Sequence, residues 1–385
     1  MVKKRWIVFF GEDWARHHST GQYLARELAS NYKVLWVNSL GLRSPKINPS
    51  DINRIRIKLY EFMFGGAQGA GFDSDKPPDL HVAAPLAIPL LKFHLVKTIN
   101  RQILKVFFNK LFKRYKIVNP IVITACPSTA IILDDIDATQ KIYYCADEHS
   151  ELAGMDSDLV KDLEADLLTK VGKVFASARL LQACKSEGHT DVYYLPHGVD
   201  YEHFRAAINT NYKYPDDLPS GGNPLIGFIG LIGEHIDLEL ISYVSEHMPD
   251  ASLVMIGPIE NGLVVPKAKN IHYLGAKSFS VLPEYLAHFN VCMLPYAQTL
   301  RNKYANPTKV REYLAAGCPV VCTPQDETNG ISDDIYVAGS PEEFVSVLNA
   351  VVIKYDSSMR PAISEVMRSH SWEARAAQMV EMMDS

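Results

Sequence analysis

The sequence lacks any apolar run long enough to cross a bilayer. Its longest runs, at 82–91 and 120–126, fall well short of the roughly 20 residues that a spanning helix needs. It also lacks an excess of positive charge, because 39 Lys and Arg stand against 44 Asp and Glu for a net charge of -5. The sequence therefore argues against a membrane span and against a nucleic-acid protein with an overall cationic field.

Cysteine is scarce, and its six residues are scattered without the spacing of a disulfide scaffold or a zinc site. We expect reduced thiols in a cytoplasmic protein. No His and carboxylate spacing is typical of a metal site, and no serine lies in a nucleophile elbow. The Gly-x-Gly-x-x-Gly turn of Rossmann dehydrogenases is also missing. We therefore expect neither metal nor cofactor, and the sequence gives hydrolases and dehydrogenases no support.

The length, the apolar content and the pattern of apolar runs indicate the class of fold. At 385 residues and 47% hydrophobic, the chain is large enough for two domains of roughly 100 to 200 residues. Short apolar runs alternate with helix-length segments, which is typical of parallel sheets covered by helices on both faces. The basic start runs into Trp6-Ile7-Val8-Phe9-Phe10 and then Gly11-Glu12-Asp13. This apolar stretch is too short for a signal peptide, and we predict a buried first strand.

The predicted elements fall into two series separated by turn formers at 216–223. The predicted strands are 6–10, 33–37, 120–124, 141–145, 173–176 and 192–195, then 225–229, 252–256, 271–274, 291–294 and 319–322. The predicted helices include 19–30, 157–169, 237–246, 281–288 and 308–316. Two doubly wound domains in tandem predict a ligand cleft between them, because such sheets bind ligands at the carboxyl ends of their strands.

One segment, 86–116, carries eight Lys or Arg residues and no Asp or Glu. On a helix, Ile99, Ile103, Phe107 and Leu111 would form one apolar face. The opposite arc would mix Leu104, Phe108 and Phe112 with Lys97, Arg101 and Lys105. Such an arc suits an anionic membrane surface, so we expect peripheral docking on the cytoplasmic face of the plasma membrane. The alternative is an ordinary domain helix whose lysines extend to water.

A loop, a helix and a buried strand follow one another at 306–321. Pro307 suits a helix start, and Gly317 suits a C-terminal cap. The first amides of such a helix, with Thr308 and Lys309, would face an anion, and Glu312 lies one turn later on the same side. We expect a diphosphate near Lys309 and sugar hydroxyls at Glu312. The alternative is an ordinary capped helix with a solvated Lys and Glu.

This segment resembles the Pro-x-Lys-x-x-Glu-Tyr-x-Ala-x-Gly-x-Pro-Val-Val pattern of nucleotide-sugar glycosyltransferases with the GT-B fold. The resemblance extends along most of the chain, from the linker at 195–200 to Ser371-Trp372-Glu373. It implies two Rossmann-like domains, at 1–200 for the acceptor and 201–368 for the donor. It also implies a C-terminal helix, 369–385, that packs back on the first domain. The further donor-binding residues that it implies are Gly230, Leu231, Gly233, Gly257, Ala276 and Tyr296.

The sequence departs from the pattern of retaining members at Tyr304, where they commonly carry a second carboxylate eight residues before Glu312. The chain is distantly similar to exopolysaccharide transferases such as the xanthan glucuronosyltransferase, an inverting enzyme that lacks this pair too. That likeness implies transfer from a UDP-sugar to a lipid-linked or polysaccharide acceptor in the synthesis of a bacterial-type cell-surface polysaccharide.

An inverting reaction needs one base near the acceptor hydroxyl. Asp147 follows the strand at 141–145, and the resemblance also points to it, although a turn or helix-capping role is the alternative. Glu148 and His149 are the fallback candidates. Asp13, with Arg16, His17 and His18, would form a polar acceptor-side cluster after the first strand, or else a capping loop.

Several other functions stay open. A retaining transferase would use the same donor site, with Asp147 stabilising positive charge instead of removing a proton. Epimerisation of a nucleotide sugar would need more carboxylates and no acceptor. A catalytically inactive sugar-nucleotide sensor or assembly subunit would keep the fold, and Lys309 with Glu312 argues only for binding.

Overall fold

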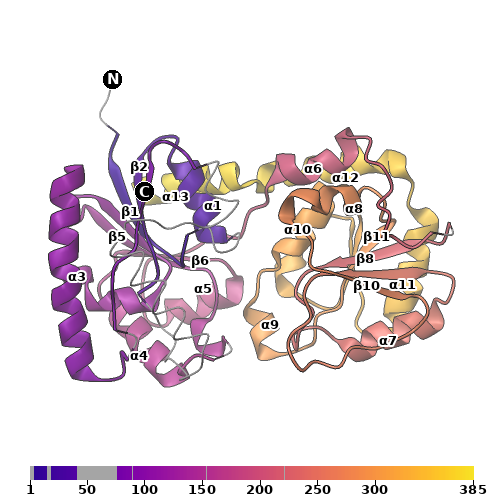
Figure 1. Ribbon diagram of the computed structural model, residues 1–385, viewed down its shortest axis with the longest axis horizontal. Coiled ribbons are helices and arrows are strands. Elements are labelled where there is room, and N and C mark those ends of the chain that lie inside the picture. Colours follow the sequence, from indigo (N-terminus) through magenta and orange to yellow (C-terminus); the bar gives the residue numbers. More distant parts are fainter. Residues whose placement is uncertain (1–3, 15–18, 41–75, 89, 153, 221) are drawn as a thin grey trace. The chain divides into compact units, whose positions relative to one another are not determined.

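A computed structural model describes residues 4–14, 19–40, 76–88, 90–152, 154–220 and 222–385. The chain divides into two compact units (Figure 1). Unit 1 comprises residues 1–196 and 376–385, and unit 2 comprises residues 197–375.

Unit 1 contains a parallel sheet of seven strands in the order β3-β2-β1-β4-β5-β6-β7. Its strands are β1 (Trp6–Phe10), β2 (Lys33–Val37), β3 (Leu80–Ala83), β4 (Ile121–Thr124), β5 (Gln140–Cys145), β6 (Lys173–Ala176) and β7 (Val192–Tyr194). Its helices are α1 (Thr20–Leu28), α3 (His94–Tyr115), α4 (Ser157–Leu168) and α5 (Arg179–Ser186), with short 3-10 turns η1 (Pro127–Ile131), η2 (Leu133–Asp135) and η3 (His149–Glu151). All five side chains of β1 are buried, as the apolar run predicts for a central strand.

Unit 2 contains a parallel sheet of six strands in the order β10-β9-β8-β11-β12-β13. Its strands are β8 (Leu225–Ile229), β9 (Ser252–Ile256), β10 (Ile271–Gly275), β11 (Val291–Leu294), β12 (Val320–Cys322) and β13 (Ile335–Val337). Its helices are α6 (Tyr201–Asn209), α7 (Leu238–His247), α8 (Leu282–Leu286), α9 (Leu300–Tyr304), α10 (Thr308–Ala315), α11 (Pro341–Lys354) and α12 (Arg360–Glu365). Its 3-10 turns are η4 (Phe279–Val281), η5 (Asp326–Thr328), η6 (Ser357–Met359) and η7 (Val366–His370).

The strand order of each sheet reverses direction once, between β1 and β4 in unit 1 and between β8 and β11 in unit 2. Right-handed crossovers that run outward from such a point cover both faces of the sheet with helices. The two parallel, doubly wound domains that the sequence predicts are therefore confirmed. In folds of this kind, ligands bind beyond the carboxyl ends of the strands at the reversal point.

The last helix, α13 (Trp372–Asp384), begins in unit 2 and ends in unit 1. The Trp372 amide donates to the carbonyl oxygen of Val199 at 3.1 Å. At the other end, Lys173 Nζ donates to the Met382 carbonyl at 2.7 Å, and Gln140 Nε2 donates to the Met383 carbonyl at 2.8 Å. Side chains at the starts of β5 and β6 thus hold the end of this helix within unit 1.

The buried face of helix α3 differs from the face predicted for the basic segment. The buried side chains are Asn100, Leu104 and Phe108, whereas Ile99 is 40% exposed. Ile103, Phe107 and Leu111 of the predicted apolar face are only half-buried, and Leu104 and Phe108 of the opposite arc supply the buried side. The reason is that Asn100, although polar, lies in the centre of the buried face.

Two cations of the predicted membrane-facing arc are engaged inside unit 1. Arg101 Nε lies 2.5 Å and Lys105 Nζ lies 3.0 Å from the carboxylate of Asp135. These two residues help to hold α3 against η2. Within the described ranges, no helix is both long enough and apolar enough to span a membrane.

Candidate functional site

The carboxyl edge of the unit 2 sheet gathers the candidate donor-binding residues. The loop after β8 carries Gly230, Leu231 and Gly233, Gly257 follows β9, Ala276 follows β10, and Tyr296 follows β11. Helix α10 begins on the same side, with Thr308 and Lys309 as its first two residues. The sheet reverses its strand order between β8 and β11, so these groups lie where such folds bind ligands.

The loop after β8 approaches the end of β9 so closely that only glycine fits there. Gly257 has a φ of +148°, and a Cβ on it would lie 1.8 Å from the Gly230 carbonyl oxygen. The Gly230 amide donates to the Ile256 carbonyl at 2.8 Å. A Cβ on Gly230 itself would lie 3.9 Å from Cε of Lys309. The bare backbone of this loop therefore lies next to the Lys309 side chain.

Tyr313 joins α10 to the end of β8. Its buried hydroxyl accepts a hydrogen bond from the Ile229 amide at 2.8 Å and donates one to the Ile229 carbonyl at 3.1 Å. Pro307 is the N-cap of α10 and provides no side-chain cap. The start of α10 is therefore positioned against the glycine loop, with free amides and the positive end of the helix dipole.

Lys309 and Glu312 form an ion pair on the first turn of α10. Lys309 Nζ lies 2.8 Å from Glu312 Oε2, and the two side chains are 26% and 14% exposed. Tyr296 lies close enough to this pair for the charge of Glu312 to affect its pKa. Burial first, and the Glu312 charge second, raise the pKa of Tyr296, against the opposing charge of Arg301. The Tyr296 hydroxyl thus stays protonated and can act as a donor.

A polar group beside Gly233 was not predicted from the sequence. The His235 ring packs against Tyr296 at 5.6 Å between ring centroids. Burial and the charge of Arg301 lower the pKa of His235, which is therefore neutral near pH 7. Glu260 comes so close to Gly233 that a Cβ there would lie 2.6 Å from its Oε2. The adjacent sequence Gly233-Glu234-His235, directly after a glycine loop, was the available signal.

Three other predicted donor residues differ in exposure. Leu231 is 44% exposed, Ala276 is exposed, and Thr308 is half-buried. Tyr304, in the position of the missing second carboxylate, is half-buried at the end of α9.

In unit 1, Asp147 is exposed on a short loop after β5. The loop backbone is held from two sides. Ser177 Oγ donates to the Ala146 carbonyl at 2.7 Å, and Cys145 Sγ donates to the Asp147 carbonyl at 3.5 Å. The structure thus presents the Asp147 carboxylate from a well-anchored backbone at the carboxyl edge of the sheet.

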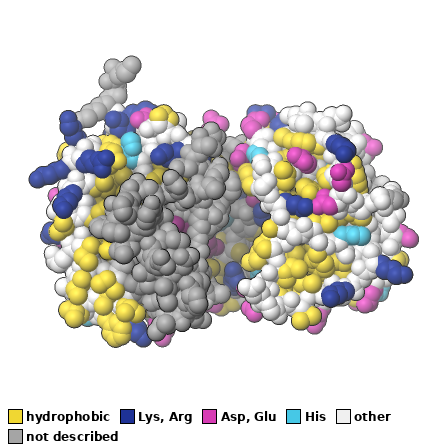
Figure 2. Space-filling view, viewed as in Figure 1, with side chains coloured by type: hydrophobic (Ala, Val, Ile, Leu, Met, Phe, Trp, Pro, Cys, Tyr) yellow, Lys and Arg dark blue, Asp and Glu magenta, His cyan; other side chains and the backbone are white. Residues whose placement is uncertain are grey.

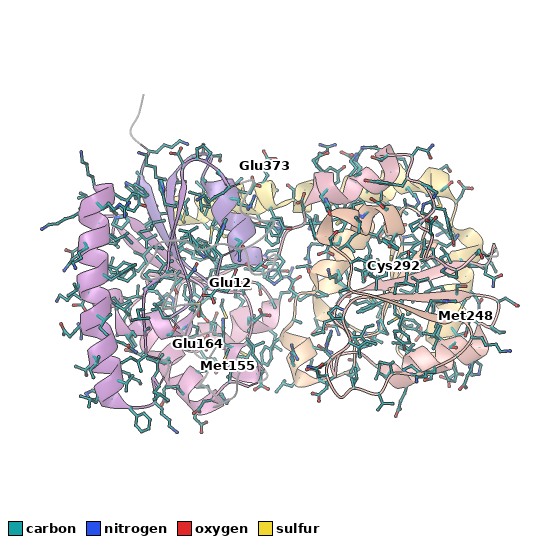
Figure 3. The ribbon with its side chains drawn as sticks, in the orientation of Figure 1. Glu12, Met155, Glu164, Met248, Cys292 and Glu373 are labelled. Carbon is teal, nitrogen blue, oxygen red and sulfur yellow. The ribbon has the colours of Figure 1, made fainter. Side chains whose placement is uncertain are left out.

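A buried ion network includes Glu148, which follows Asp147 in this loop, and Glu164, which is labelled in Figure 3. Lys185 Nζ lies 2.8 Å from Glu148 Oε2 and 2.7 Å from Glu164 Oε2, and its side chain is 7% exposed. The Tyr143 hydroxyl donates to Glu164 Oε1, and the Ser150 hydroxyl donates to Glu148 Oε1, both at 2.7 Å.

This network gives Glu148 a structural role. Burial opposes the ionisation of Glu148, but the hydrogen bonds from Lys185 and Ser150 lower its pKa overall. A carboxylate held in this way is a poor proton acceptor near neutral pH. His149, the other fallback candidate, is half-buried at the start of η3.

The acceptor-side cluster is described only in part. Asp13 is half-buried after β1, but Arg16, His17 and His18 lie outside the described residues. The neighbouring Glu12 binds to the start of α1, where its Oε1 accepts hydrogen bonds from the hydroxyl of the N-cap Ser19 and from Gln22 Nε2. This carboxylate was not singled out from the sequence.

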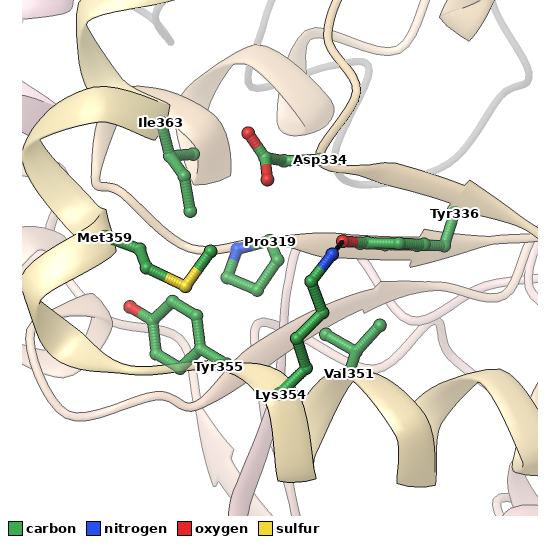
Figure 4. A pocket seen from close by; sticks show the side chains of 8 residues that line it. All are labelled: Pro319, Asp334, Tyr336, Val351, Lys354, Tyr355, Met359 and Ile363. Atoms are coloured by element: carbon green, nitrogen blue, oxygen red, sulfur yellow. Dashed lines mark hydrogen bonds between the residues drawn. The ribbon is translucent and has the colours of Figure 1, made fainter.

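A shallow hollow lies at the other edge of the unit 2 sheet (Figure 4). Its wall includes Pro319 before β12 and Asp334 before β13, and its cavity volume is only about 10 Å³. Ligand pockets are usually larger, at roughly 300 Å³ or more. This hollow is therefore a weaker candidate than the edge that carries Lys309.

Part of unit 2 resembles a known protein family, and a relative matches a longer part of the chain. Residues 224–352 match the family model described as glycosyl transferases group 1, and the candidate donor residues of unit 2 all lie in this range. TuaH of Bacillus subtilis (strain 168), which is named as a glycosyltransferase of teichuronic acid biosynthesis, is 25% identical over 266 residues. The alignment spans 63% of this chain and 66% of that relative's length.

Solved structures resemble the whole chain. Sucrose-phosphate synthase from Thermosynechococcus elongatus has a TM-score of 0.67 and 13% identity, and the match covers 99% of this chain and 98% of that one. HepE of Anabaena, in complex with UDP and glucose, has a TM-score of 0.66 and 10% identity over 98% of this chain and 99% of its own. The solved structures thus confirm the GT-B fold, and the family match and the relative support a glycosyltransferase. The specific likeness to the xanthan enzyme stays a prediction.

Proposed function

We propose that this GT-B glycosyltransferase moves a sugar from a nucleoside diphosphate sugar, with UDP as the favoured nucleotide, to a hydroxyl of a lipid-linked or growing saccharide. The pathway would be synthesis of a cell-surface polysaccharide, on the cytoplasmic side of the plasma membrane. Two comparisons support the proposal. One relative is named for teichuronic acid biosynthesis, and one structural neighbour was solved with UDP and glucose.

The observation that carries the proposal is the arrangement of Lys309 and Glu312 on the first turn of α10, beside the bare backbone at Gly230. A diphosphate requires positive charge and amide donors, and a helix start with a lysine provides both. Glu312 would accept hydrogen bonds from two hydroxyls of the nucleotide or sugar. On donor binding, the diphosphate would replace Glu312 as the main counter-charge of Lys309.

In the proposed reaction, the acceptor oxygen forms a bond to C1 of the donor sugar while the bond from C1 to the diphosphate oxygen breaks. The Asp147 carboxylate takes the acceptor proton, and the nucleoside diphosphate leaves with both electrons of the broken bond. Lys309 and the α10 amides stabilise the charge that develops on the leaving group. The displacement inverts the configuration at C1 and requires no metal.

A retaining reaction is the second candidate on the same donor site. The half-buried Tyr304 stands where retaining members commonly carry a carboxylate, and this favours inversion. In the retaining case, Asp147 would stabilise positive charge and Asp147→Asn would leave the anomer of the product unchanged.

The test is a transfer assay with UDP-sugars and a lipid-linked saccharide acceptor, in which the product anomer is determined by NMR. We expect a product of inverted configuration, and turnover that is lost in Asp147→Asn while UDP binding persists. A product with the donor's configuration would replace the inverting mechanism by the retaining one. Epimerised nucleotide sugar formed without acceptor would contradict transfer. Full activity of Asp147→Ala in polysaccharide synthesis by cells would point to a non-catalytic subunit.

A further inference from the structure

Exposed apolar side chains are concentrated in one short part of unit 1. Seven of the fifteen large hydrophobic side chains that are exposed in the described part of the chain lie between residues 88 and 118. They are Ile88, Leu90, Phe93, Leu95, Ile99, Val106 and Val118. Such a concentration of exposed apolar side chains marks a candidate contact site.

On α3 these side chains form a stripe. Leu95, Ile99 and Val106 are 70%, 40% and 54% exposed, and their spacing of four and seven residues puts them on one arc of the helix. The buried residues Asn100 and Leu104 lie on the other side. The stripe therefore faces solvent along the first half of α3.

The same stripe becomes basic toward the end of α3. Lys110 and Lys113 continue its spacing and are exposed, and no Asp or Glu occurs between residues 86 and 116. Arg101 and Lys105 lie on a different arc, where both pair with the single carboxylate of Asp135. We name the outward-facing residues Leu95, Ile99, Val106, Lys110 and Lys113 the α3 stripe.

The segment before α3 is fastened to the helix by a buried amide. Asn100 is fully buried, its Nδ2 donates to the Ile88 carbonyl, and its Oδ1 accepts from the Ile88 amide, both at 2.8 Å. This pair of bonds holds the exposed side chains of Ile88, Leu90 and Phe93 near the apolar end of the stripe. Lys92 Nζ lies 5.5 Å from the Phe93 ring centroid and adds a cation there.

Figure 2 shows this division on the surface of unit 1. Yellow side chains gather at the lower end of α3, and dark-blue ones gather at its upper end. The apolar part of this surface thus lies toward one end of the helix and the basic part toward the other.

We infer that the α3 stripe docks unit 1 onto a lipid bilayer with anionic headgroups. The headgroup region offers negative charge to Lys110 and Lys113, and the adjoining acyl region accepts Leu95, Ile99 and Val106. A second copy of the chain is a less suitable partner than a bilayer. The α3 stripe contains no Asp or Glu that could pair with Lys110 and Lys113 of the other copy. The inference is independent of the proposed sugar transfer.

The first experiment is co-sedimentation of the full chain with vesicles, without donor or acceptor. We expect binding to vesicles of phosphatidylglycerol mixed with phosphatidylcholine and little binding to phosphatidylcholine alone. Raising the salt to 1 M should weaken the binding, because it screens exposed charges. Absence of binding to the anionic vesicles would overturn the inference and leave the transferase proposal untouched.

Paired variants test the orientation of the helix. Lys110→Gln with Lys113→Gln should lower the vesicle partition coefficient by roughly 25-fold, about five-fold for each cation. Leu95→Gln with Val106→Gln should lower it at least about ten-fold. The matched control, Arg101→Gln with Lys105→Gln, removes the same charge from the arc that faces Asp135 and should have a smaller effect.

Thermal unfolding without lipid must accompany these measurements. The stripe variants should keep the wild-type Tm, because their side chains are exposed, whereas the control should lower it. Equal loss of vesicle binding in the stripe and control variants would overturn the assigned surface. So would a wild-type dimer in lipid-free gel filtration that Leu95→Gln dissociates, since the occupant would then be a second copy.

Discussion

The candidate sites of the two units are built in different ways. In unit 2, Tyr296, Lys309 and Glu312 come from 17 consecutive residues, and Lys309 and Glu312 share one turn of α10. In unit 1, the loop of Asp147 rests on Lys185 and Glu164, which come from α5 and α4. Local spacing therefore defines the first site, and tertiary packing defines the second.

The two sites also use charge differently. The ion pair of Lys309 and Glu312 is partly exposed, so a ligand can exchange with it. The pairs that Lys185 makes are buried, and they are shielded from ligands and salt. The ligand binding that we propose would therefore use the charges of unit 2. In unit 1 the buried charges would support the loop, and the exposed Asp147 would carry out the proposed chemistry.

The largest expected effect is on turnover, and it distinguishes the proposed catalytic residue Asp147 from the residues that support its loop. Asp147→Asn should lower turnover by roughly 10²- to 10⁴-fold, the range for loss of a general base, with unchanged UDP affinity and stability. Steady-state kinetics and calorimetric titration with UDP measure the two quantities. The matched control is Glu151→Gln, an exposed neighbour, which should behave like wild type. Wild-type turnover in Asp147→Asn would remove this residue from the mechanism.

Replacing Lys185, the buried cation of unit 1, should mainly lower the stability of the protein. Lys185→Met leaves Glu148 and Glu164 without their shared counter-ion, so the free energy of unfolding should fall by about 3–5 kcal/mol. Urea unfolding measures the change. Lys170→Met removes a lysine that pairs with Asp134 and Asp166, which are about half exposed, and that also donates to the Ala130 carbonyl. This control should cost less than Lys185→Met, because exposed ion pairs contribute about 1 kcal/mol or less. Equal losses would contradict the supporting role of the network.

Tyr313→Phe tests how the start of α10 is positioned in unit 2. The Ile229 amide would lose its buried acceptor, which should cost about 1–3 kcal/mol of stability. UDP affinity should fall too, because Ile229 leads into the Gly230 loop. Tyr355→Phe is the control, since its hydroxyl donates to the Gly317 carbonyl at the other end of α10. It should lower stability and spare UDP binding, and a fall in affinity for both variants would contradict the assignment.

The smallest effect concerns pH and the stability of unit 2. Burial first, and the charges of Arg311 and Arg375 second, lower the pKa of His197 to about 3. Histidine in the unfolded chain titrates near 6.5, so the unfolded state binds the proton more readily. Stability is therefore complete above pH 6.5 and is lost as the pH falls toward 3.

For His197 alone, we expect a loss of about 2 kcal/mol between pH 7 and pH 5. Urea unfolding at both pH values measures it, and His197→Asn should reduce the difference. An identical pH dependence in wild type and variant would show that His197 is not responsible.

Much of the fold could be predicted because its strands are short, apolar and fully buried. The predicted strands at 6–10 and 33–37 coincide with β1 and β2. In contrast, β3 was missed, because Leu80-His81-Val82-Ala83 is short and contains a polar side chain. Its place in the sheet comes from parallel pairing with β2, which the sequence of β3 alone does not reveal.

The start of α10 was predictable for a similar reason, since Pro307, Lys309 and Glu312 lie at helical spacing within one segment. The network of Lys185 was not, because its members lie at three separate places in the sequence. The orientation of α3 failed at Asn100, where a buried hydrogen bond to the Ile88 backbone outweighs the polarity of the side chain. Hydrophobic periodicity alone does not account for such a bond.

The most direct test of the central claim, that the start of α10 binds a nucleoside diphosphate, is a thermal unfolding series with UDP, GDP, ADP and TDP. At about 100 times its Kd, a ligand stabilises the folded protein by about 2.7 kcal/mol. We expect one of these nucleotides, UDP by preference, to raise the Tm of the wild type by roughly 5 °C or more. The same nucleotide should leave the Tm of Lys309→Ala nearly unchanged. No shift with any nucleotide, or equal shifts in wild type and Lys309→Ala, would contradict the account.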